Sequence, residues 1–365
     1  MQIGGTKKLL DTLNQKSAPP SETNDFFCWS ANLITIKRRK AVVVVNDSNR
    51  FGFVLFGLKA KDFAQLDHLI ADGIRTCLAR ESISEAAIRA YFEQAGELVV
   101  TKTRGRMAVA RLNKACERVD LFGDYGDPSG LYQIELSRLI NNDLFKPSKT
   151  RDYCHPYELL IEDFEDFYGA RVIATEAVDL LIKLDLGSTS ATRRLLVPLW
   201  VSFEELHKII QIAFDWQGFH LHDFKLLDDQ GHCVITIISR REEDFDPDTC
   251  DSLIMRDNAV PISEFLAKRP RIIYTYDFGD DWNHDITVLD IVSDYDKNYP
   301  TCIIAAGNRP PEDVGGIPGY EHYRQVMDNP DHPDYQDLKD WASSQFHQPC
   351  DIERINRRLR HVLMW

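Results

Sequence analysis

The pattern that most constrains the fold of this chain runs from residue 177 to residue 214. Apolar residues largely alternate with charged ones over 178–186, which is typical of a strand with one buried face. A polar turn and a second apolar segment at 193–197 follow. Ser202 and Glu205 then have the spacing of a capping box, and apolar residues recur behind them at helical intervals. The sequence therefore predicts two antiparallel strands that pack against a helix.

Strand and helix patterns are mixed in the rest of the chain. Two apolar runs flank the polar turn 46–49 and predict a hairpin, and Ser82 and Glu85 have the spacing of a second capping box, opening a helix that ends at Gly96. We expect an α+β fold of two mixed domains, in which an antiparallel or mixed sheet of the carboxy-terminal domain packs against helices. Strands are expected at 41–45, 50–56, 97–101, 107–110, 234–238, 271–276 and 282–292, and further helices at 62–78 and after Asp351.

Length and charge both indicate two domains. The chain has 365 residues, whereas single hydrophobic cores stop growing at about 250–300 residues. Residues 1–150 carry 22 Lys and Arg against 17 Asp and Glu, and residues 151–365 carry 21 against 40. We expect a small basic domain at 1–120, a turn-rich connecting region at 121–170 and an acidic domain at 171–365.

The composition also limits the setting and the partners. No apolar run approaches the roughly 20 residues of a membrane-spanning helix, and the amino terminus lacks the apolar stretch of a secretion signal, so no membrane partner is expected. The eight cysteines include no Cys-x-x-Cys pair, which favours reduced thiols in the cytoplasm. The basic half would suit nucleic acid or another anionic partner, and the acidic half would suit cations or metal ions.

The densest polar motif of the acidic half is segment 274–285, which places four carboxylates and one imidazole around a tight turn. Such a cluster can bind a divalent metal ion or position a general acid and a general base. His284 shares a strand face with Trp282 and Ile286, so a buried structural histidine is the alternative. The candidate residues here are Asp277, Asp280, Asp281 and His284.

Two other motifs accompany it. In His220-Leu-His222, both imidazoles would lie on one face of a strand, a spacing that metal sites use, whereas on a loop the spacing means little. Segment 308–320 combines the adjacent prolines Pro310 and Pro311 and three glycines with Glu312 and Asp313, and it ends at Tyr320. A loop of this rigidity either faces a ligand or acts as a structural clasp.

A basic cluster stands out in the first half. Its residues would bind phosphate groups if segments 37–40 and 102–106 lie side by side, and otherwise they form a solvated surface. The candidate anion-binding residues are Lys37, Arg38, Arg39, Lys40, Arg104 and Arg106, with Lys102 beside them.

The acidic half resembles the plasmid pRiA4b ORF-3-like family over residues 175–360. The resemblance rests on segments 200–224, 276–284 and 310–320, which occur in that order. Residues 3–118 resemble an uncharacterised bacterial domain through Thr-Lys-Lys-Leu-Leu near the amino terminus, Trp-x-Ala-Asn-Leu at 29–33 and Arg-Arg-Lys at 38–40. The resemblance implies an α+β fold and a bacterial, plasmid or mobile-element setting, and it implies no established activity.

No complete catalytic signature is present. The sequence has no P-loop, no dinucleotide-binding Gly-x-Gly-x-x-Gly, no Gly-x-Ser-x-Gly and no His-Glu-x-x-His. We therefore expect a binding or regulatory module with a ligand cleft in the carboxy-terminal domain. The alternative is a metal-dependent hydrolase of the phosphodiesterase or nuclease type, which requires the Asp and His side chains to share a divalent metal ion. The candidate cleft residues are His222, Asp277, Asp280, Asp281, His284, Glu312, Asp313 and Tyr320.

Overall fold

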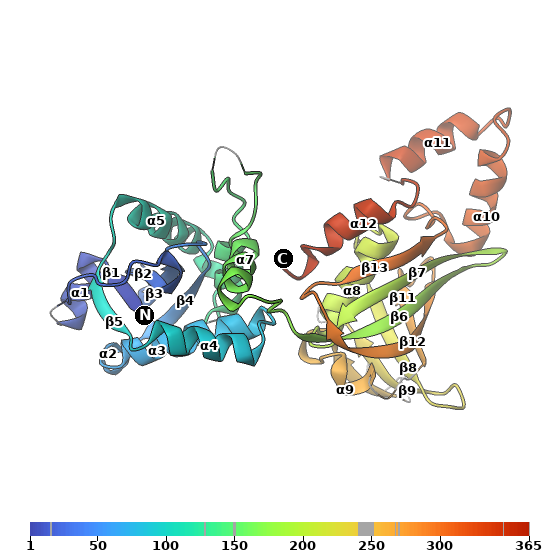
Figure 1. Ribbon diagram of the computed structural model, residues 1–365. Helices are drawn as coiled ribbons and strands as arrows, with labels where there is room; N and C mark the ends of the chain where they lie inside the picture. Colours follow the sequence, from blue (N-terminus) through green and yellow to red (C-terminus); the bar gives the residue numbers. More distant parts are fainter. Residues whose placement is uncertain are drawn as a thin grey trace. The chain divides into compact units, whose positions relative to one another are not determined.

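The computed structural model divides the chain into two compact units, Met1–Ala174 and Thr175–Leu363 (Figure 1). It describes residues 1–14, 17–127, 129–148, 151–239, 252–266, 268, 271–345 and 347–364. Each unit combines one open sheet with helices, so the predicted α+β class is confirmed. Among these residues, no helix has both the length and the apolar character needed to span a bilayer.

The first unit is built on a five-stranded sheet in the order β4-β3-β2-β1-β5. β1 pairs in parallel with both β2 and β5, whereas β2, β3 and β4 form an antiparallel meander. The elements are β1 (Gln2–Gly5), α1 (Lys7–Leu13), β2 (Cys28–Ile36), β3 (Arg39–Asn46), β4 (Gly52–Leu58), α2 (Ala60–Phe63), α3 (Leu66–Arg80), α4 (Glu85–Ala95), β5 (Val99–Lys102), α5 (Arg106–Leu121), α6 (Ile134–Asn141) and α7 (Pro156–Tyr168).

Helices cover both faces of this sheet. On one face Val42 and Val44 pack with side chains of α3, α4 and α7, and on the other Val43 and Val45 pack with side chains of α5 and α6. The unbroken apolar run 41–45 is explained by this burial, because a strand covered on both faces has no polar side to alternate with. Residues 121–170 contain α6 and α7, whose apolar side chains belong to these two cores.

Two local predictions in the first unit are wrong. Residues 107–110 lie in α5 and not in a strand, because apolar positions recur at helical spacing over the full length of α5, a pattern that a four-residue window cannot reveal. The N-cap of α4 is Ser84, whose Oγ accepts a hydrogen bond from the backbone N–H of Ala87, whereas Ser82 has a left-handed backbone. The predicted hairpin and the end of α4 at Gly96 are confirmed.

The second unit contains an eight-stranded sheet in the order β10-β9-β8-β11-β12-β6-β7-β13. All neighbours pair antiparallel except β9 and β10. The elements are β6 (Thr175–Leu186), β7 (Thr189–Pro198), α8 (Phe203–Phe214), β8 (His222–Leu227), β9 (Cys233–Ile238), β10 (Leu253–Arg256), α9 (Ser263–Leu266), β11 (Arg271–Tyr276), β12 (Trp282–Tyr295), β13 (Thr301–Ala306), α10 (Gly316–Met327), α11 (Tyr335–Ser344) and α12 (Ile352–Leu359).

The core of the second unit lies between the sheet and α8 (Figure 1). The predicted capping box is confirmed: Ser202 Oγ accepts from the Glu205 N–H at 3.2 Å, and the Glu205 carboxylate accepts from the Ser202 N–H at 2.8 Å. The apolar residues of α8 pack on those of β6, β7, β11 and β12, and α12 adds Ile355 and Leu359 to the same core. The strand–strand–helix arrangement predicted at 177–214 is therefore confirmed, as is the helix after Asp351.

Candidate functional site

The three polar motifs of the acidic half, far apart in sequence, meet at one place in the second unit. The loop that joins α8 to β8 donates two backbone hydrogen bonds: Gln217 N–H to Glu312 Oε1 at 2.7 Å and Phe219 N–H to Tyr276 Oη at 3.0 Å. The turn between β11 and β12 binds the glycine-rich loop through Asp280 Oδ2, which accepts from Gly315 N–H at 3.1 Å. Tertiary contacts between loops therefore create the site.

Glu312 is the buried centre of this arrangement. Glu312 is only 1% exposed. Its carboxylate accepts a hydrogen bond from the Tyr276 hydroxyl at 3.3 Å and another from the Gln217 N–H. Burial raises the pKa of the Glu312 carboxyl, and the Gln217 N–H and the Arg309 guanidinium oppose that shift. Glu312 thus connects all three motifs and has its carboxylate oriented by them.

The three motifs each contribute one side chain to a compact cluster, which comprises His220, Asp277 and Asp313. His220 Nε2 lies 3.0 Å from Asp313 Oδ1 and 3.6 Å from Asp277 Oδ2, and the potential ligand atoms of all three lie within 4.8 Å of one another. Within the parts of the chain that the structure describes, this is the one group of three or more His, Cys, Asp and Glu side chains with that spacing.

Left-handed backbone geometry orients the two carboxylates of the cluster. The φ angle is 58° at Asp277 and 55° at Asp313, a region that Asp adopts more readily than most other non-glycine residues. Asp277 Oδ1 accepts a hydrogen bond from Gly279 N–H at 2.9 Å, so its Oδ2 is directed to His220. The turn thereby presents one carboxylate oxygen to the imidazole and uses the other for its own structure.

Two glycines of the third motif are required by close packing. A Cβ atom at Gly319 would lie 1.9 Å from the Val314 carbonyl oxygen. A Cβ atom at Gly316, whose φ angle is 65°, would lie 2.9 Å from the Asp280 carbonyl oxygen. These approaches are closer than any real Cβ contact allows. The glycine-rich segment therefore allows the loop with Asp313 to reach the β11–β12 turn.

His284 lies away from the cluster. Its ring is fully buried on the core face of β12, as the alternation predicts; Nδ1 faces the Trp282 carbonyl oxygen at 3.0 Å, and Nε2 accepts from the Trp216 indole N–H at 3.3 Å. Burial lowers the pKa of His284 to about 4. Both ring nitrogens are occupied by protein partners, so His284 is placed as a structural histidine.

His222 is also placed elsewhere. It opens β8 opposite Tyr276, and its ring stacks on that of His207 in α8 with a centroid distance of 3.6 Å and an interplanar angle of 5°. Its Nε2 lies 3.3 Å from Asp257 Oδ2. Of the other candidates, Asp281 is exposed in the turn, and Tyr320 stacks on Tyr323 at the start of α10.

These placements bear on the metal site expected for a hydrolase. His222, Asp281, His284 and Glu312 are not among the side chains that converge on one point in the described residues. The converging set is His220, Asp277 and Asp313. The sequence pointed to the His220-Leu-His222 motif, but only His222 was among the candidate cleft residues. Since His220 lies in the loop and His222 in the strand, the two imidazoles have different neighbours.

A cavity of about 470 Å³ lies beside α8 and adjoins the cluster through His220. Its walls include the polar side chains of His207, Gln211 and His222 and the apolar side chains of Trp216 and Leu221. Gln211 is only 6% exposed; its Nε2 donates to the Tyr274 hydroxyl at 2.9 Å, and its Oε1 has no hydrogen-bond partner among the described residues. Sequence reasoning missed His207 and Gln211, although their i,i+4 spacing on α8 places them on one helix face.

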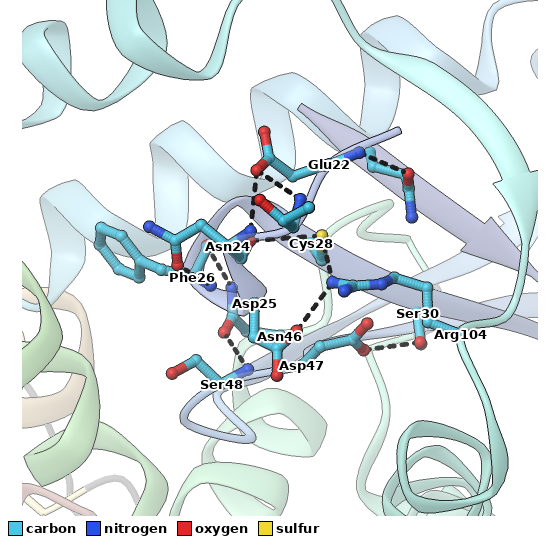
Figure 2. Close-up of polar contacts among 12 residues, drawn as sticks. Glu22, Asn24, Asp25, Phe26, Cys28, Ser30, Asn46, Asp47, Ser48 and Arg104 are labelled. Atoms are coloured by element: carbon cyan, nitrogen blue, oxygen red, sulfur yellow. Dashed lines mark hydrogen bonds and ion pairs between the residues drawn. The ribbon is translucent and has the colours of Figure 1, made fainter. Parts of the chain in front are cut away.

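The basic residues of the first unit are not gathered into one patch. Arg104 binds Asp25 at 2.7 Å and Cys28 Sγ at 2.8 Å, beside the beginning of β2 (Figure 2). Lys37 and Arg38 form the turn after β2, and Arg39 and Lys40 begin β3. This end of β2 is eight residues beyond Cys28, or roughly 26 Å along an extended strand. Lys37 is paired with Asp124 at 2.7 Å, and Lys40 lies over the Phe63 ring. The two basic segments are therefore not side by side.

The charge of the whole first unit is also close to neutral. Residues 1–174 carry 24 Lys and Arg and 23 Asp and Glu, because acidic residues of α7 lie in this unit. Figure 2 shows Cys28 beside Arg104. Burial raises the pKa of the Cys28 thiol to about 11, and this effect is larger than the opposite effect of the Arg104 charge. The thiol is thus protonated at neutral pH.

Comparison with known proteins connects these motifs to a family. Residues 176–356 match the family model of the plasmid pRiA4b ORF-3-like proteins. His220, Asp277 and Asp313 all lie within the matched segment, and the cavity walls extend beyond it to Arg358 and Val362. Residues 2–159 match a second family model, a domain of unknown function (DUF6933). Both resemblances expected from the sequence are confirmed, and neither family description names an activity.

Two individual relatives match the pRiA4b ORF-3-like half. Uncharacterized protein y4hQ of Sinorhizobium fredii is 27% identical over 172 residues, which are 47% of this chain and 84% of the relative. The crystal structure of the protein of unknown function MM3350 from Methanosarcina mazei Go1 is 27% identical, with a TM-score of 0.39, and covers 46% of this chain and 90% of its own.

Proposed function

We propose that the pRiA4b ORF-3-like domain binds a small polar organic molecule in the cavity beside α8 and that the protein acts as a binding or regulatory module. The observation that carries this proposal is the unpartnered, buried Oε1 of Gln211, a residue that lines a cavity of about 470 Å³. Buried polar atoms are nearly always hydrogen-bonded, so an orphaned acceptor in a cavity wall calls for a donor from a ligand or a bound water.

The walls of the cavity define the chemistry of the ligand. Gln211 Oε1 calls for an N–H or O–H donor, and Trp216 and the stacked rings of His207 and His222 favour a flat ring. Phe219, which is 68% exposed, also lines the cavity, and an exposed aromatic side chain at a cavity mouth is typical of binding sites. The ligand is therefore expected to be a planar molecule of drug-like size with a hydrogen-bond donor on its ring or on a short substituent.

The test is a thermal-shift screen of the full chain against planar heteroaromatic and phenolic metabolites, followed by calorimetric titration of each hit. Gln211→Leu is expected to weaken binding of a hit at least tenfold, because the ligand donor then meets an apolar wall. Gln336→Leu, the same change at an exposed position of α11, is the matched control and should leave binding unchanged. Equal affinities of wild type and Gln211→Leu for every hit would contradict the proposal.

The cellular location of the protein is part of the same proposal. We place the protein in the bacterial cytoplasm, because the seven cysteines within the described part of the chain have free thiols, while Cys250 lies outside it. The association with plasmids or mobile elements is supported only by the family description. A nucleic-acid partner for the first unit has weak support, since that unit is nearly neutral and its basic segments lie apart.

A further inference from the structure

We propose that His220, Asp277 and Asp313 form a binding site for a divalent transition-metal ion of the zinc type. Each residue comes from a different motif, and each is supplied by a loop whose position is set by contacts to the other two. One imidazole nitrogen and two carboxylate oxygens are donors that Zn²⁺ and similar ions accept, whereas Mg²⁺ and Ca²⁺ are bound almost entirely through oxygen.

The separations of the donor atoms fit a metal ion. In a tetrahedral zinc site with bonds of 2.0–2.1 Å, any two donor atoms lie about 3.3 Å apart. His220 Nε2 lies 3.0 Å from Asp313 Oδ1 and 3.6 Å from Asp277 Oδ2, on either side of that value. The third separation, between the Asp277 and Asp313 oxygens, is within 4.8 Å, so side-chain adjustment would bring all three donors to one ion.

The protein does not satisfy His220 Nε2 by hydrogen bonding. His220 Nε2 is itself enclosed, yet neither carboxylate contact has the alignment of a hydrogen bond, and the atom has no hydrogen-bond partner among the residues described. Two carboxylates that approach one imidazole also repel each other, and a bound cation offsets this repulsion. Asp277, with a side chain that is 10% exposed, cannot turn out to water without breaking the turn that its Oδ1 holds.

The position of Glu312 supports a metal site over a chance cluster. Its buried carboxylate precedes Asp313 in the chain and binds the backbone of the loop that carries His220. It therefore holds two of the three proposed ligands in register, the role that outer residues have around metal ions. Because its oxygens are used by Gln217 and Tyr276, we do not count Glu312 among the ligands.

The site adjoins the proposed ligand cavity, and this part of the inference rests on the proposed function. His220 also lines the cavity, as does Gln211, whose buried Oε1 lacks a hydrogen-bond partner among the described residues. Three protein ligands leave at least one coordination position open. An oxygen or nitrogen of the cavity ligand can occupy that position.

The first experiment is calorimetric titration of Zn²⁺ into the chelator-treated full chain at neutral pH. We expect one site per chain, and affinity at least tenfold lower in His220→Ala and in Asp313→Ala. Asp313 is 57% exposed, so its substitution should leave the fold intact, which circular dichroism verifies. His232→Ala is the matched control, because His232 forms an exposed pair with Asp228 at 3.4 Å, and it should bind Zn²⁺ like the wild type.

Replacement of Zn²⁺ by Co²⁺ provides a second readout, since a four-coordinate cobalt site absorbs visible light and the absorption should disappear in His220→Ala. Absence of Zn²⁺ binding by the wild type, or equal affinity in His220→Ala and Asp313→Ala, would overturn the metal site. Gln211→Leu separates the two proposals: it should retain Zn²⁺ and lose the cavity ligand. Ligand binding by the metal-free chain would preserve the proposed function even if the metal site failed.

Discussion

His284 provides a sharp test of the physical reasoning. Its Nδ1 faces two backbone carbonyl oxygens, those of Tyr274 at 3.2 Å and Trp282 at 3.0 Å, so the ring proton must reside on Nδ1. Nε2 accepts from the Trp216 indole N–H at 3.3 Å. A second proton on Nε2 would face that N–H donor in a fully buried site, and burial accordingly lowers the pKa of His284 to about 4.

The sign and the size of the pH effect follow from this pKa. A histidine whose pKa is lower in the folded state than its unfolded value of 6.5 binds more protons when unfolded, so stability is complete above pH 6.5 and is lost as pH falls toward the folded value. Between pH 7 and pH 5, protonation of the unfolded state alone should reduce the free energy of unfolding by about 2 kcal/mol. The loss depends little on the folded-state pKa, since a value one unit higher would lower it by only about 0.3 kcal/mol.

The assay is urea unfolding, followed by circular dichroism, of wild type and His284→Gln at pH 7 and pH 5. The variant is expected to be less stable at pH 7, since Gln cannot make all three hydrogen bonds, but its loss between the two pH values should be smaller by about 2 kcal/mol. Other titrating groups, including the buried His347, contribute equally to both proteins and cancel in the comparison. Equal losses in wild type and variant would refute the reasoning.

Three further outcomes are expected. Gly319→Ala should destabilise the second unit by about 3 kcal/mol or more, because the new Cβ would overlap the Val314 carbonyl oxygen. Gly231→Ala should cost only about 1 kcal/mol, because no atom lies within 4 Å of the new Cβ and only the left-handed backbone (φ 86°) opposes it. Denaturant unfolding measures both changes. Gln211→Leu should change the free energy of unfolding by less than about 1 kcal/mol, since removal of an unpaired acceptor offsets the lost hydrogen bond to the Tyr274 hydroxyl, and a loss above about 2 kcal/mol would contradict this. Burial raises the pKa of Cys28 to about 11, so iodoacetamide at pH 8 should label it slowly until urea is added, as mass spectrometry of the peptides can show; fast labelling of the folded chain would be inconsistent with that pKa.

Several elements were predictable because their causes are local. Alternation over 178–186 depends on one buried strand face, and the Ser202 capping box depends on atoms three residues apart, so both are readable from neighbouring letters. Residues 107–110 were misassigned because a short apolar run is compatible with strand and helix alike. The parallel strand β1 was missed, since four residues joined to partners more than 20 positions away leave no local periodicity.

The membership of the candidate site was only partly predictable. The sequence identified all three motifs, and Asp277 and Asp313 were among the candidates. It did not identify His220, because the choice between His220 and His222 depends on where the loop ends and β8 begins. His284 and Asp280 were also candidates, but the His284 ring is hydrogen-bonded within the core, and the Asp280 carboxylate binds the backbone of the glycine-rich loop.

The sequence by itself determined the class of fold, the family resemblances and the segments where polar groups concentrate, since these depend on residue types and on spacings within a few turns or strands. Only the tertiary structure decided which of those groups converge. The reason is that the order β8-β11-β12 and the contacts of Glu312 bring together loops that are about 40 to 90 residues apart, and such long-range proximity is fixed by sheet pairing and packing. Nothing in the local sequence distinguishes His220 from His222, but Asp277 and Asp313 lie beside one and His207 beside the other.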